Sequence, residues 1–273
     1  MPRLSIIIVS YNSAHHLDRC LQSLTGPPPR TDHEVIVVDN ASTDGTPQYL
    51  RQRWPGIRLL DAGGNLGFAR ANNLGLRQTF GELVLLLNPD TIAPAPAIDR
   101  LVAALDADPA AAIAGPRIVD EHGRAELSFG TMISPAAELR QKLLGKLRPI
   151  VERLTSTTRY VDWVSGACLL GRRSDLEGVG LLDERYFMYT EDVDLCAAVR
   201  ARGRKVLFLA DAQIVHLRGQ SRRSAAGATD VAYRRSQIAF YEKHHPKWAF
   251  WLKAYLKLRG RLPDRQDSPS TRV

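Results

Sequence analysis

The run Leu4-Ser5-Ile6-Ile7-Ile8-Val9, followed at once by Ser10-Tyr11-Asn12, decides the fold class. The run is almost continuous in apolar residues, whereas a half-exposed strand would alternate apolar and polar side chains. A strand of this kind is buried on both faces, which is typical of a parallel sheet covered by helices on each side. The polar residues after it stand at the carboxyl end of the strand, where open parallel sheets bind ligands.

The pattern of short apolar runs separated by helical segments repeats along the first half of the chain. Further strands are predicted at 34–38, 57–61, 83–87 and 112–115, and helices at 14–24, 46–53, 68–79 and 95–106. We also expect a helix over 134–153 and a strand over 205–209. The alternation predicts an α/β fold, a Rossmann-like three-layer sandwich with a mostly parallel central sheet.

Composition narrows the class of protein. The chain has 273 residues, 44% hydrophobic and 24% charged, which excludes disordered, collagen-like and small disulfide-rich proteins. Its three cysteines lie far apart, without the spacing of a zinc site or a disulfide framework, and indicate a reducing cytosol. No signal peptide is recognisable, and no apolar run approaches the roughly 18 residues of a spanning helix. We expect a cytoplasmic protein, soluble or peripherally bound to a membrane.

Positive charge gathers at the end of the chain. Residues 216–273 hold 13 of the 37 basic but only 4 of the 29 acidic side chains, so the first 215 residues are close to neutral. We therefore expect a catalytic domain at 1–217, a basic amphipathic helical extension at 218–262 and a disordered tail at 263–273. No nucleic-acid-binding motif accompanies the charge, and no nucleic-acid partner is expected.

The extension carries an aromatic stripe at helical spacing. Its members are Trp248, Trp251, Leu252, Tyr255 and Leu258, with Lys253 and Lys257 beside them. Tryptophan, tyrosine and lysine on one short helix are typical of a segment that lies in a membrane interface. The alternative is a helix that covers the core with its apolar stripe and leaves its lysines in water.

Three polar loops follow predicted strands and supply candidates for binding. Asp39 can accept a hydrogen bond from a pyrimidine ring N–H or a ribose hydroxyl, or it can cap a turn. The loop Gly63-Gly64-Asn65-Leu66-Gly67 precedes a helix, as phosphate-binding loops do, but it lacks the spacing of a nicotinamide or ATP site. Arg70 on that helix faces either an anionic ligand or solvent. Asp90, after the most apolar strand, can bind a divalent cation on two phosphates or belong to an ordinary proline turn.

Acidic residues gather after the aromatic run Tyr186-Phe187-Met188-Tyr189. Glu191, Asp192 and Asp194 fall within four residues. Acids favour the first turn of a helix, so a solvated helix start explains them without any function. An enclosed carboxyl group among aromatic side chains has a raised pKa, however, and that suits a general base. His216 is either a metal ligand or a buried core histidine.

Together these segments resemble family-two glycosyltransferases of the GT-A fold, in the rhamnosyltransferase-like branch. The resemblance rests on 5–12, 37–46, 65–69 with Asn72-Asn73, 85–90, 163–167 and 190–195, which occur in family order between about Leu4 and His216. It implies inverting transfer of a sugar from a nucleotide-diphosphate donor to a glycan or polyprenyl-linked acceptor. In this sequence Asn88 stands where the family usually has a first aspartate before Asp90, which implies a weaker metal site.

The resemblance also implies roles for single residues. The donor would lie against Ser10, Tyr11, Asp39, Asn65, Gly67, Arg70, Asn72 and Asp90, with Mg²⁺ or Mn²⁺ held by Asp90 and His216. Asp192 would deprotonate the acceptor hydroxyl with support from Glu191, and Trp163 and Gly166 would shape the sugar and acceptor pocket.

The expected function is transfer from a dTDP- or UDP-sugar in cell-envelope polysaccharide biosynthesis. The branch implies dTDP-L-rhamnose as a candidate donor, and lipid-linked acceptors would bring the enzyme to the inner face of the cell membrane. The alternative, motivated by Asn88, is a catalytically weak nucleotide-sugar-binding subunit of an envelope glycan complex.

Overall fold

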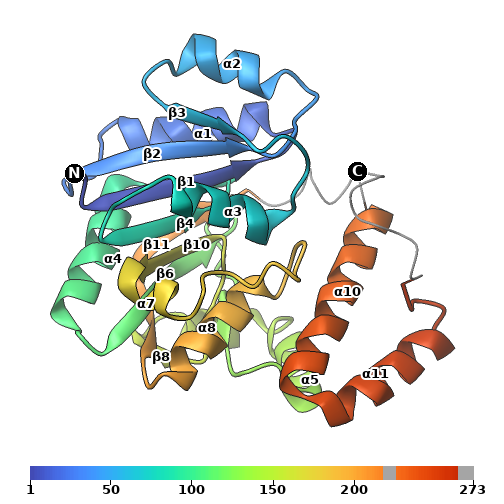
Figure 1. The fold of residues 1–273 in the computed structure, drawn as a ribbon. Coiled ribbons are helices and arrows are strands. Elements are labelled where there is room, and N and C mark those ends of the chain that lie inside the picture. Colours follow the sequence, from blue (N-terminus) through green and yellow to red (C-terminus); the bar gives the residue numbers. More distant parts are fainter. Residues whose placement is uncertain (218–225, 264–273) are drawn as a thin grey trace.

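The computed structural model describes residues 1–217 and 226–263 (Figure 1). The strands are β1 (Leu4–Ser10), β2 (His33–Asp39), β3 (Arg58–Asp61), β4 (Leu83–Leu87), β5 (Thr91–Ile92), β6 (Ala111–Val119), β7 (Phe129–Gly130), β8 (Arg159–Val161), β9 (Trp163–Val164), β10 (Cys168–Arg172) and β11 (Lys205–His216). The helices are α1 (Ala14–Thr25), α2 (Thr46–Arg53), α3 (Phe68–Arg77), α4 (Ala95–Ala107), α5 (Pro135–Leu144), α6 (Arg148–Leu154), α7 (Arg173–Gly178), α8 (Glu191–Ala201), α10 (Ala226–His244) and α11 (Pro246–Leu258).

The central sheet follows the order β3-β2-β1-β4-β10-β6-β11-β5, with β8 beside β11. Strands β3, β2, β1 and β4 are parallel, as are β6 and β11, which confirms the mostly parallel sheet. Strand β10 runs antiparallel between β4 and β6. Winding proceeds from β1 to β3 on one side and resumes with β4 on the other. In open sheets of this kind, ligands bind in the crevice outside the carboxyl ends of the strands at such a reversal, which here means β1 and β4.

Two apolar clusters fill the layers on either side of the sheet. Because side chains alternate along a strand, Ile6 and Ile8 join one cluster with α1 and α4, whereas Ile7 joins the other with α3 and α8. Helix α10 contributes the fully buried Phe240 to this second cluster. The extension therefore packs against the core of the sheet domain.

The helix predicted over 134–153 is two helices. Gly145 follows the end of α5, and α6 begins at Arg148 with Pro149 in its first turn. A glycine and a proline so close together favour a break in the helix. The predicted tail and the junction between the catalytic domain and the extension fall mostly in 218–225 and 264–273, outside the described residues.

The aromatic stripe of the extension does not cover the core. Trp248, Trp251, Tyr255 and Leu258 are exposed, and Leu252 alone among the five packs against the second cluster. The buried face of α11 is formed instead by Ala249 and Leu256. The core-covering alternative is therefore wrong for four members of the stripe. Within residues 1–217 and 226–263, no helix has the length and apolar character needed to cross a bilayer.

Candidate functional site

Polar side chains meet at the carboxyl ends of β1, β2 and β3. The register places Ser10 beside Asp39, and Asp39 beside Asp61. Asp39 is 4% exposed, and its Oδ2 accepts a hydrogen bond from the Ser42 amide at 3.2 Å. Its Oδ1 is buried and has no hydrogen-bond partner among the described residues. One oxygen thus caps the turn, while the other needs a donor, because an unpaired buried acceptor is costly.

Two asparagines lock the loops around this edge. The Asn40 side chain donates to Asn65 Oδ1 at 2.9 Å and accepts from the Leu66 amide at 2.8 Å. Asn65 Oδ1 also accepts from the Gly67 amide at 3.1 Å. The Asn65 side chain therefore holds its own loop against the loop after β2. The sequence singled out Asn65 for donor binding but missed the role of Asn40.

The glycine loop makes its closest contact with the segment that precedes the acidic cluster. The Phe68 amide donates to the Phe187 carbonyl oxygen at 2.6 Å, so the first amide of α3 has a protein partner. Gly67 has φ of +79°, and a Cβ there would collide with the same carbonyl. Asn72 on α3 is buried, donates to the Phe68 carbonyl, and leaves its Oδ1 without a partner among the described residues.

Arg70 lies on the exposed side of α3 and has a protein partner. Its Nε is 3.5 Å from Glu184 Oε2, and Arg77 shares the same carboxylate. Asn73, next to the predicted Asn72, donates to Glu184 and to the Leu182 carbonyl. These contacts tie α3 to the loop before the acidic cluster. The structure thus places Arg70 at the solvent-exposed surface, where it forms an ion pair with Glu184.

Asp90 and His216 face each other after β4 and at the end of β11. Asp90 Oδ1 lies 3.1 Å from His216 Nε2, and both side chains are largely buried. Burial alone would raise the pKa of Asp90, but the hydrogen bond and charge of His216 outweigh it and lower that pKa. The carboxylate is therefore ionised at neutral pH, as a cation ligand must be.

The pair fits a divalent cation. Adjacent ligands of an octahedral Mg²⁺ or Mn²⁺ site, each about 2.1 Å from the ion, lie about 3 Å apart, close to the observed 3.1 Å. Among the described residues, no group of three or more histidine, cysteine or acidic side chains is arranged to hold a metal. The protein would thus supply two ligands and leave the remaining positions to phosphate oxygens and water, as is usual for magnesium on phosphates.

His16, on the first turn of α1, is a neighbour of this pair that sequence reasoning missed. A positive charge on His16 contributes, as the smallest of the causes, to lowering the pKa of Asp90. Its Nδ1 is buried and has no hydrogen-bond partner among the described residues. Nothing in the spacing of His16 along the chain marks it, because α1 brings it to the site only through packing.

The acidic cluster begins α8 and is enclosed. Asp192 accepts hydrogen bonds from the Gly166 amide at 2.7 Å and the Val193 amide at 2.8 Å. Burial raises the pKa of Asp192. Burial also raises the pKa of Glu191, further increased by the charge of Asp192, and Glu191 Oε2 has no partner among the described residues. Both carboxyl groups are thus held less readily ionised than an exposed acid, and only Glu191 is further affected by the charge of its neighbour.

A short backbone path joins the acidic cluster to the Asp90 site. Gly166 donates to Asp192, and the next residue, Ala167, accepts from the Asn88 amide at 3.0 Å. Trp163 is turned away from this path: its ring packs on Gly130 and its Nε1 donates to the Thr131 carbonyl at 3.0 Å. Gly166 is therefore the member of the predicted pocket pair that touches the acidic cluster.

The extension holds the backbone in front of the cluster. Tyr189 and Thr190 have φ of +75° and +66°, a strained conformation for residues with side chains. Ser236 of α10 donates to the Met188 carbonyl at 2.7 Å, and the Tyr233 ring packs edge-on against that of Tyr189, with ring centroids 5.8 Å apart. Strained backbone persists only where its surroundings enforce it, and here α10 is part of those surroundings.

Asp194, the third acidic residue, anchors the extension. Asp194 is 3% exposed. Its carboxylate oxygens lie 2.8 Å from Lys243 Nζ, 2.6 Å from His244 Nε2 and 3.2 Å from the Tyr186 hydroxyl. The sequence grouped Asp194 with the catalytic candidates, but the structure gives it an ion-paired role between α8 and α10. A buried ion pair of this kind is strongly destabilised when either partner is removed.

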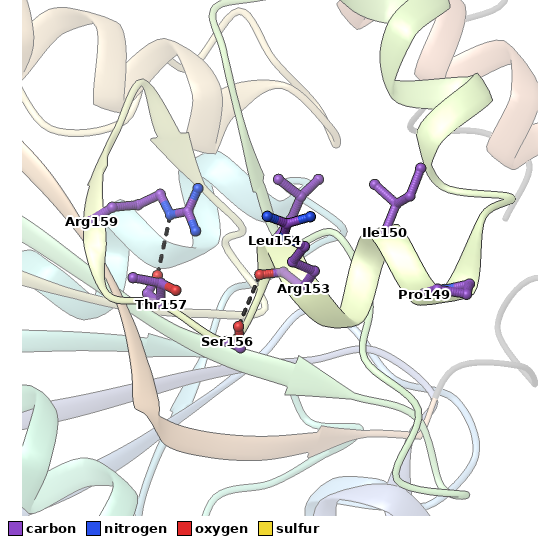
Figure 2. A pocket seen from close by; sticks show the side chains of 7 residues that line it. All are labelled: Pro149, Ile150, Arg153, Leu154, Ser156, Thr157 and Arg159. Atoms are coloured by element: carbon purple, nitrogen blue, oxygen red, sulfur yellow. Dashed lines mark hydrogen bonds between the residues drawn. The ribbon is translucent and has the colours of Figure 1, made fainter.

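The two grooves found among the described residues lie elsewhere. The larger, of about 710 Å³, is lined by Pro149, Ile150, Arg153, Leu154, Ser156, Thr157 and Arg159 (Figure 2). The other, of about 340 Å³, is lined by residues of α5, β7 and β8 and shares Leu154 and Arg159 with the first. Neither contains a residue that the sequence singled out.

Residues 5–179 match Glycosyl transferase family 2. The chain belongs to this family. It is 34% identical over 284 residues to the N-acetylglucosaminyl-diphospho-decaprenol L-rhamnosyltransferase of Mycobacterium tuberculosis, covering 95% of this chain and 92% of that protein. It is 26% identical over 230 residues to rhamnosyltransferase WbbL of Escherichia coli, covering 80% and 85% of the two chains. The resemblance to the rhamnosyltransferase-like branch is confirmed.

Solved structures confirm the GT-A fold of this glycosyltransferase. The mannosyltransferase PcManGT from Pyrobaculum calidifontis, in complex with GDP-Man and Mn²⁺, superposes with a TM-score of 0.62 at 21% identity, over 94% of this chain and 70% of that one. TarS 1–349 from Staphylococcus aureus, in complex with UDP-GlcNAc, superposes with a TM-score of 0.61 at 19% identity, over 87% of this chain and 65% of that one.

The contact between Gly166 and Asp192 makes a testable prediction for the glycosyltransferase. A Cβ at residue 166 would lie 3.2 Å from Asp192 Cβ and 3.4 Å from its Oδ2, so Gly166→Ala must shift the carboxylate. We expect kcat to fall about 10- to 100-fold, because small displacements of a reacting group are costly, with unchanged nucleotide affinity. Gly56→Ala, whose Cβ would meet no atom within 4 Å, is the matched control. Wild-type kcat in Gly166→Ala would contradict this role.

Glu191 makes a prediction about stability. The pKa of Glu191 is raised in the folded state. At a pH above its pKa in the unfolded chain, folding must therefore either take up a proton or bury a negative charge, and both cost free energy. That cost is absent at low pH and grows as the pH rises. We expect Glu191→Gln to increase the free energy of unfolding at pH 8 by on the order of 1 to 3 kcal/mol, and by less at pH 4. Urea unfolding at both pH values measures this, and an equal effect at both would exclude the mechanism.

Proposed function

We propose that this glycosyltransferase moves a sugar from a dTDP- or UDP-sugar to an acceptor hydroxyl by a single, inverting displacement. The proposal is carried by one observation: the backbone path through Gly166, Ala167 and Asn88 links the enclosed carboxyl group of Asp192 to the Asp90–His216 pair. A displacement at the anomeric carbon needs a base on the acceptor side and charge stabilisation at the leaving diphosphate. The two groups supply these functions from neighbouring elements.

The base of the donor nucleotide would lie at the ends of β1 and β2. Asp39 Oδ1, which has no described partner, would accept from the pyrimidine ring N–H, with Ser10 and Tyr11 alongside. Asn65 and Gly67 would act by fixing the loop, because their polar groups already contact protein atoms. Asn72 Oδ1 is buried and available, whereas Arg70 would reach the donor only by leaving Glu184.

Asp90 and His216 would hold Mg²⁺ or Mn²⁺ on the diphosphate. The bound cation supplies charge neutralisation of the departing nucleotide, which stabilises it by several kcal/mol. The presence of Mn²⁺ in the PcManGT complex supports a divalent cation in this fold. Because Asn88 is neutral, the site carries one negative charge less than an Asp-x-Asp sequence would, and we expect modest affinity for the free ion.

Asp192 would accept the proton of the acceptor hydroxyl. The amides of Gly166 and Val193 orient its carboxylate, and the raised pKa makes it a stronger base than an exposed aspartate. Glu191, buried beside it with a raised pKa, would limit the negative charge of the site. Gly166 would shape the acceptor side of the pocket, and Trp163 would support it from behind through Gly130.

L-Rhamnose, from dTDP-L-rhamnose, is our proposed donor sugar, and a polyprenyl-linked glycan is our proposed acceptor. Both are supported by the two rhamnosyltransferases named above, one of which acts, by its name, on a diphospho-decaprenol. The product would enter a cell-envelope polysaccharide, and the enzyme would work at the cytoplasmic face of the membrane. The exposed aromatic residues and lysines of α11 support peripheral contact with that membrane.

Titration calorimetry with dTDP and UDP, each with and without Mn²⁺, tests the donor site. We expect one of the two to bind more tightly when Mn²⁺ is present. A screen of dTDP- and UDP-sugars with lipid-linked acceptors then tests transfer, and the anomeric configuration of the product by NMR tests inversion. If no nucleotide sugar is consumed, the proposed reaction is wrong.

The second candidate is a nucleotide-sugar-binding subunit with little activity, favoured only by the neutral Asn88. It predicts donor binding without turnover and no loss of rate in Asp192→Asn. The enclosure and raised pKa of Asp192 argue against it, because a binding subunit has no use for a positioned base.

A further inference from the structure

Two segments far apart in the sequence expose large apolar side chains close together. Helix α5 has no buried residue, and the α5–α6 hairpin presents Leu139, Leu143, Leu147 and Ile150 to solvent. Helix α11 presents Trp248, Phe250, Trp251, Tyr255 and Leu258. Soluble surfaces rarely expose apolar residues of this size in such density unless they bind something.

Hydrogen bonds fix α5 against α10 and against the residue that precedes α11. Glu138, in the first turn of α5, accepts from Gln237 at 2.9 Å and from Tyr241 at 3.2 Å, both on α10. His245 Nε2, at the junction of α10 and α11, lies 2.8 Å from the Ile133 carbonyl just before α5. Figure 1 shows α5 against this junction, with α11 leading away from it.

Basic side chains outnumber acidic ones in both segments: residues 135–154 hold five against Glu138 and Glu152, which bond Gln237 and Arg117, and residues 246–258 hold three against none. No aspartate or glutamate occurs in 139–151 or in 246–263. Lys142, Lys146, Arg148, Lys247 and Lys257 form no ion pair with any residue in the described part of the chain. The groove beside α6 adds Ile150 and Leu154 together with Arg153, which also lacks an ion pair there (Figure 2).

We propose that the α5–α6 hairpin and α11 form one membrane-binding face, which docks on a bilayer containing anionic lipid. Apolar and aromatic side chains would enter the interface, while the unpaired lysines and arginines would meet the phosphate headgroups. Association of two copies through this face would bring like charges together, which disfavours a dimer. The inference deepens the proposed function, because a lipid-linked acceptor would be presented at the same surface.

The test is co-sedimentation of the full-length protein with phosphatidylcholine vesicles containing about 30 mol % phosphatidylglycerol. We expect L139Q/L143Q/L147Q to lower the partition coefficient about tenfold or more, and W248S/W251S to do the same. Phe80→Ser is the matched control: Phe80 is 65% exposed, just before β4 at the other end of the sheet from the crevice, and its loss should change nothing. Truncation after His245 retains the ion pairs of Lys243 and His244 with Asp194. The truncated protein should keep residual vesicle binding, and L139Q/L143Q/L147Q introduced into it should remove that binding.

Two results would overturn the proposal. One is wild-type vesicle binding by the triple variant, which would leave α11 as the sole contact. The other is a wild-type dimer, seen by light scattering, that the triple substitution dissociates. Nucleotide titration without vesicles should be identical for all of these variants, so failure of membrane docking can be distinguished from failure of the proposed transferase function.

Discussion

Replacing Asp192 with asparagine is expected to lower kcat for sugar transfer by about 10²- to 10⁴-fold, the usual contribution of a positioned general base. Asparagine keeps the size of the side chain and can still accept from one of the two amides, Gly166 or Val193, which bond different oxygens of Asp192, while the basic group is lost. Nucleotide affinity should be unchanged. Initial rates with saturating donor and acceptor, together with calorimetry, separate the two effects.

The pH profile gives a second readout for Asp192. A base works only when deprotonated, so the rate should fall as the pH drops through its pKa, which burial places above the ordinary aspartate range. The raised pKa of Asp192 comes from burial and not from the charge of Glu191, so Glu191→Gln should leave this acidic limb where it is. Asp106→Asn, an exposed carboxylate paired with Arg3, is the matched control and should behave as wild type. A fully active Asp192→Asn would remove the base assignment and favour the binding-subunit candidate.

Replacing Asp90 with alanine should abolish the effect of Mn²⁺ on nucleotide binding and lower kcat by about 10²-fold or more, since cation stabilisation of a leaving diphosphate is worth several kcal/mol. The substitution also leaves His216 without its carboxylate partner. Calorimetry with and without Mn²⁺ measures the first effect directly. In the absence of metal, the variant and the wild-type protein should bind the nucleotide similarly.

Asp211→Ala provides the control for Asp90→Ala. Asp211 is an exposed carboxylate on β11, the strand that also carries His216, so its loss tests for nonspecific effects on that strand. It should retain the response to Mn²⁺. His216→Ala should weaken that response as well, and a His216→Ala protein with a normal response would leave Asp90 as the only protein ligand.

Much of the sheet was predictable because a strand that is buried on both faces shows a continuous run of apolar residues in the sequence. The apolar runs at 4–9 and 83–87 correspond to β1 and β4, and the polar residues after them stand at the carboxyl ends of those strands. The break within 134–153 was missed because apolar residues continue at helical spacing past Gly145, whereas the helical backbone ends at Leu144 and resumes only at Arg148.

The partners of the site residues could not be predicted, because each lies on a distant element. Sequence spacing marks Asp192 as a candidate base, but only folding places the Gly166 amide on it and Ala167 against Asn88. In the same way, Asp194 resembles its neighbours in sequence. Its distinct role follows from Lys243 and His244, some fifty residues later, which neutralise it in the core.

The sequence by itself determined the α/β class, the succession of polar loops and the residue types available for chemistry, because a strand buried on both faces requires a continuous apolar run. Tertiary structure alone decided which face of α11 is buried. Helical periodicity shows that an apolar stripe exists, but not what it packs against. Here Ala249 and Leu256 are buried, and Trp248 and Trp251 remain exposed to solvent.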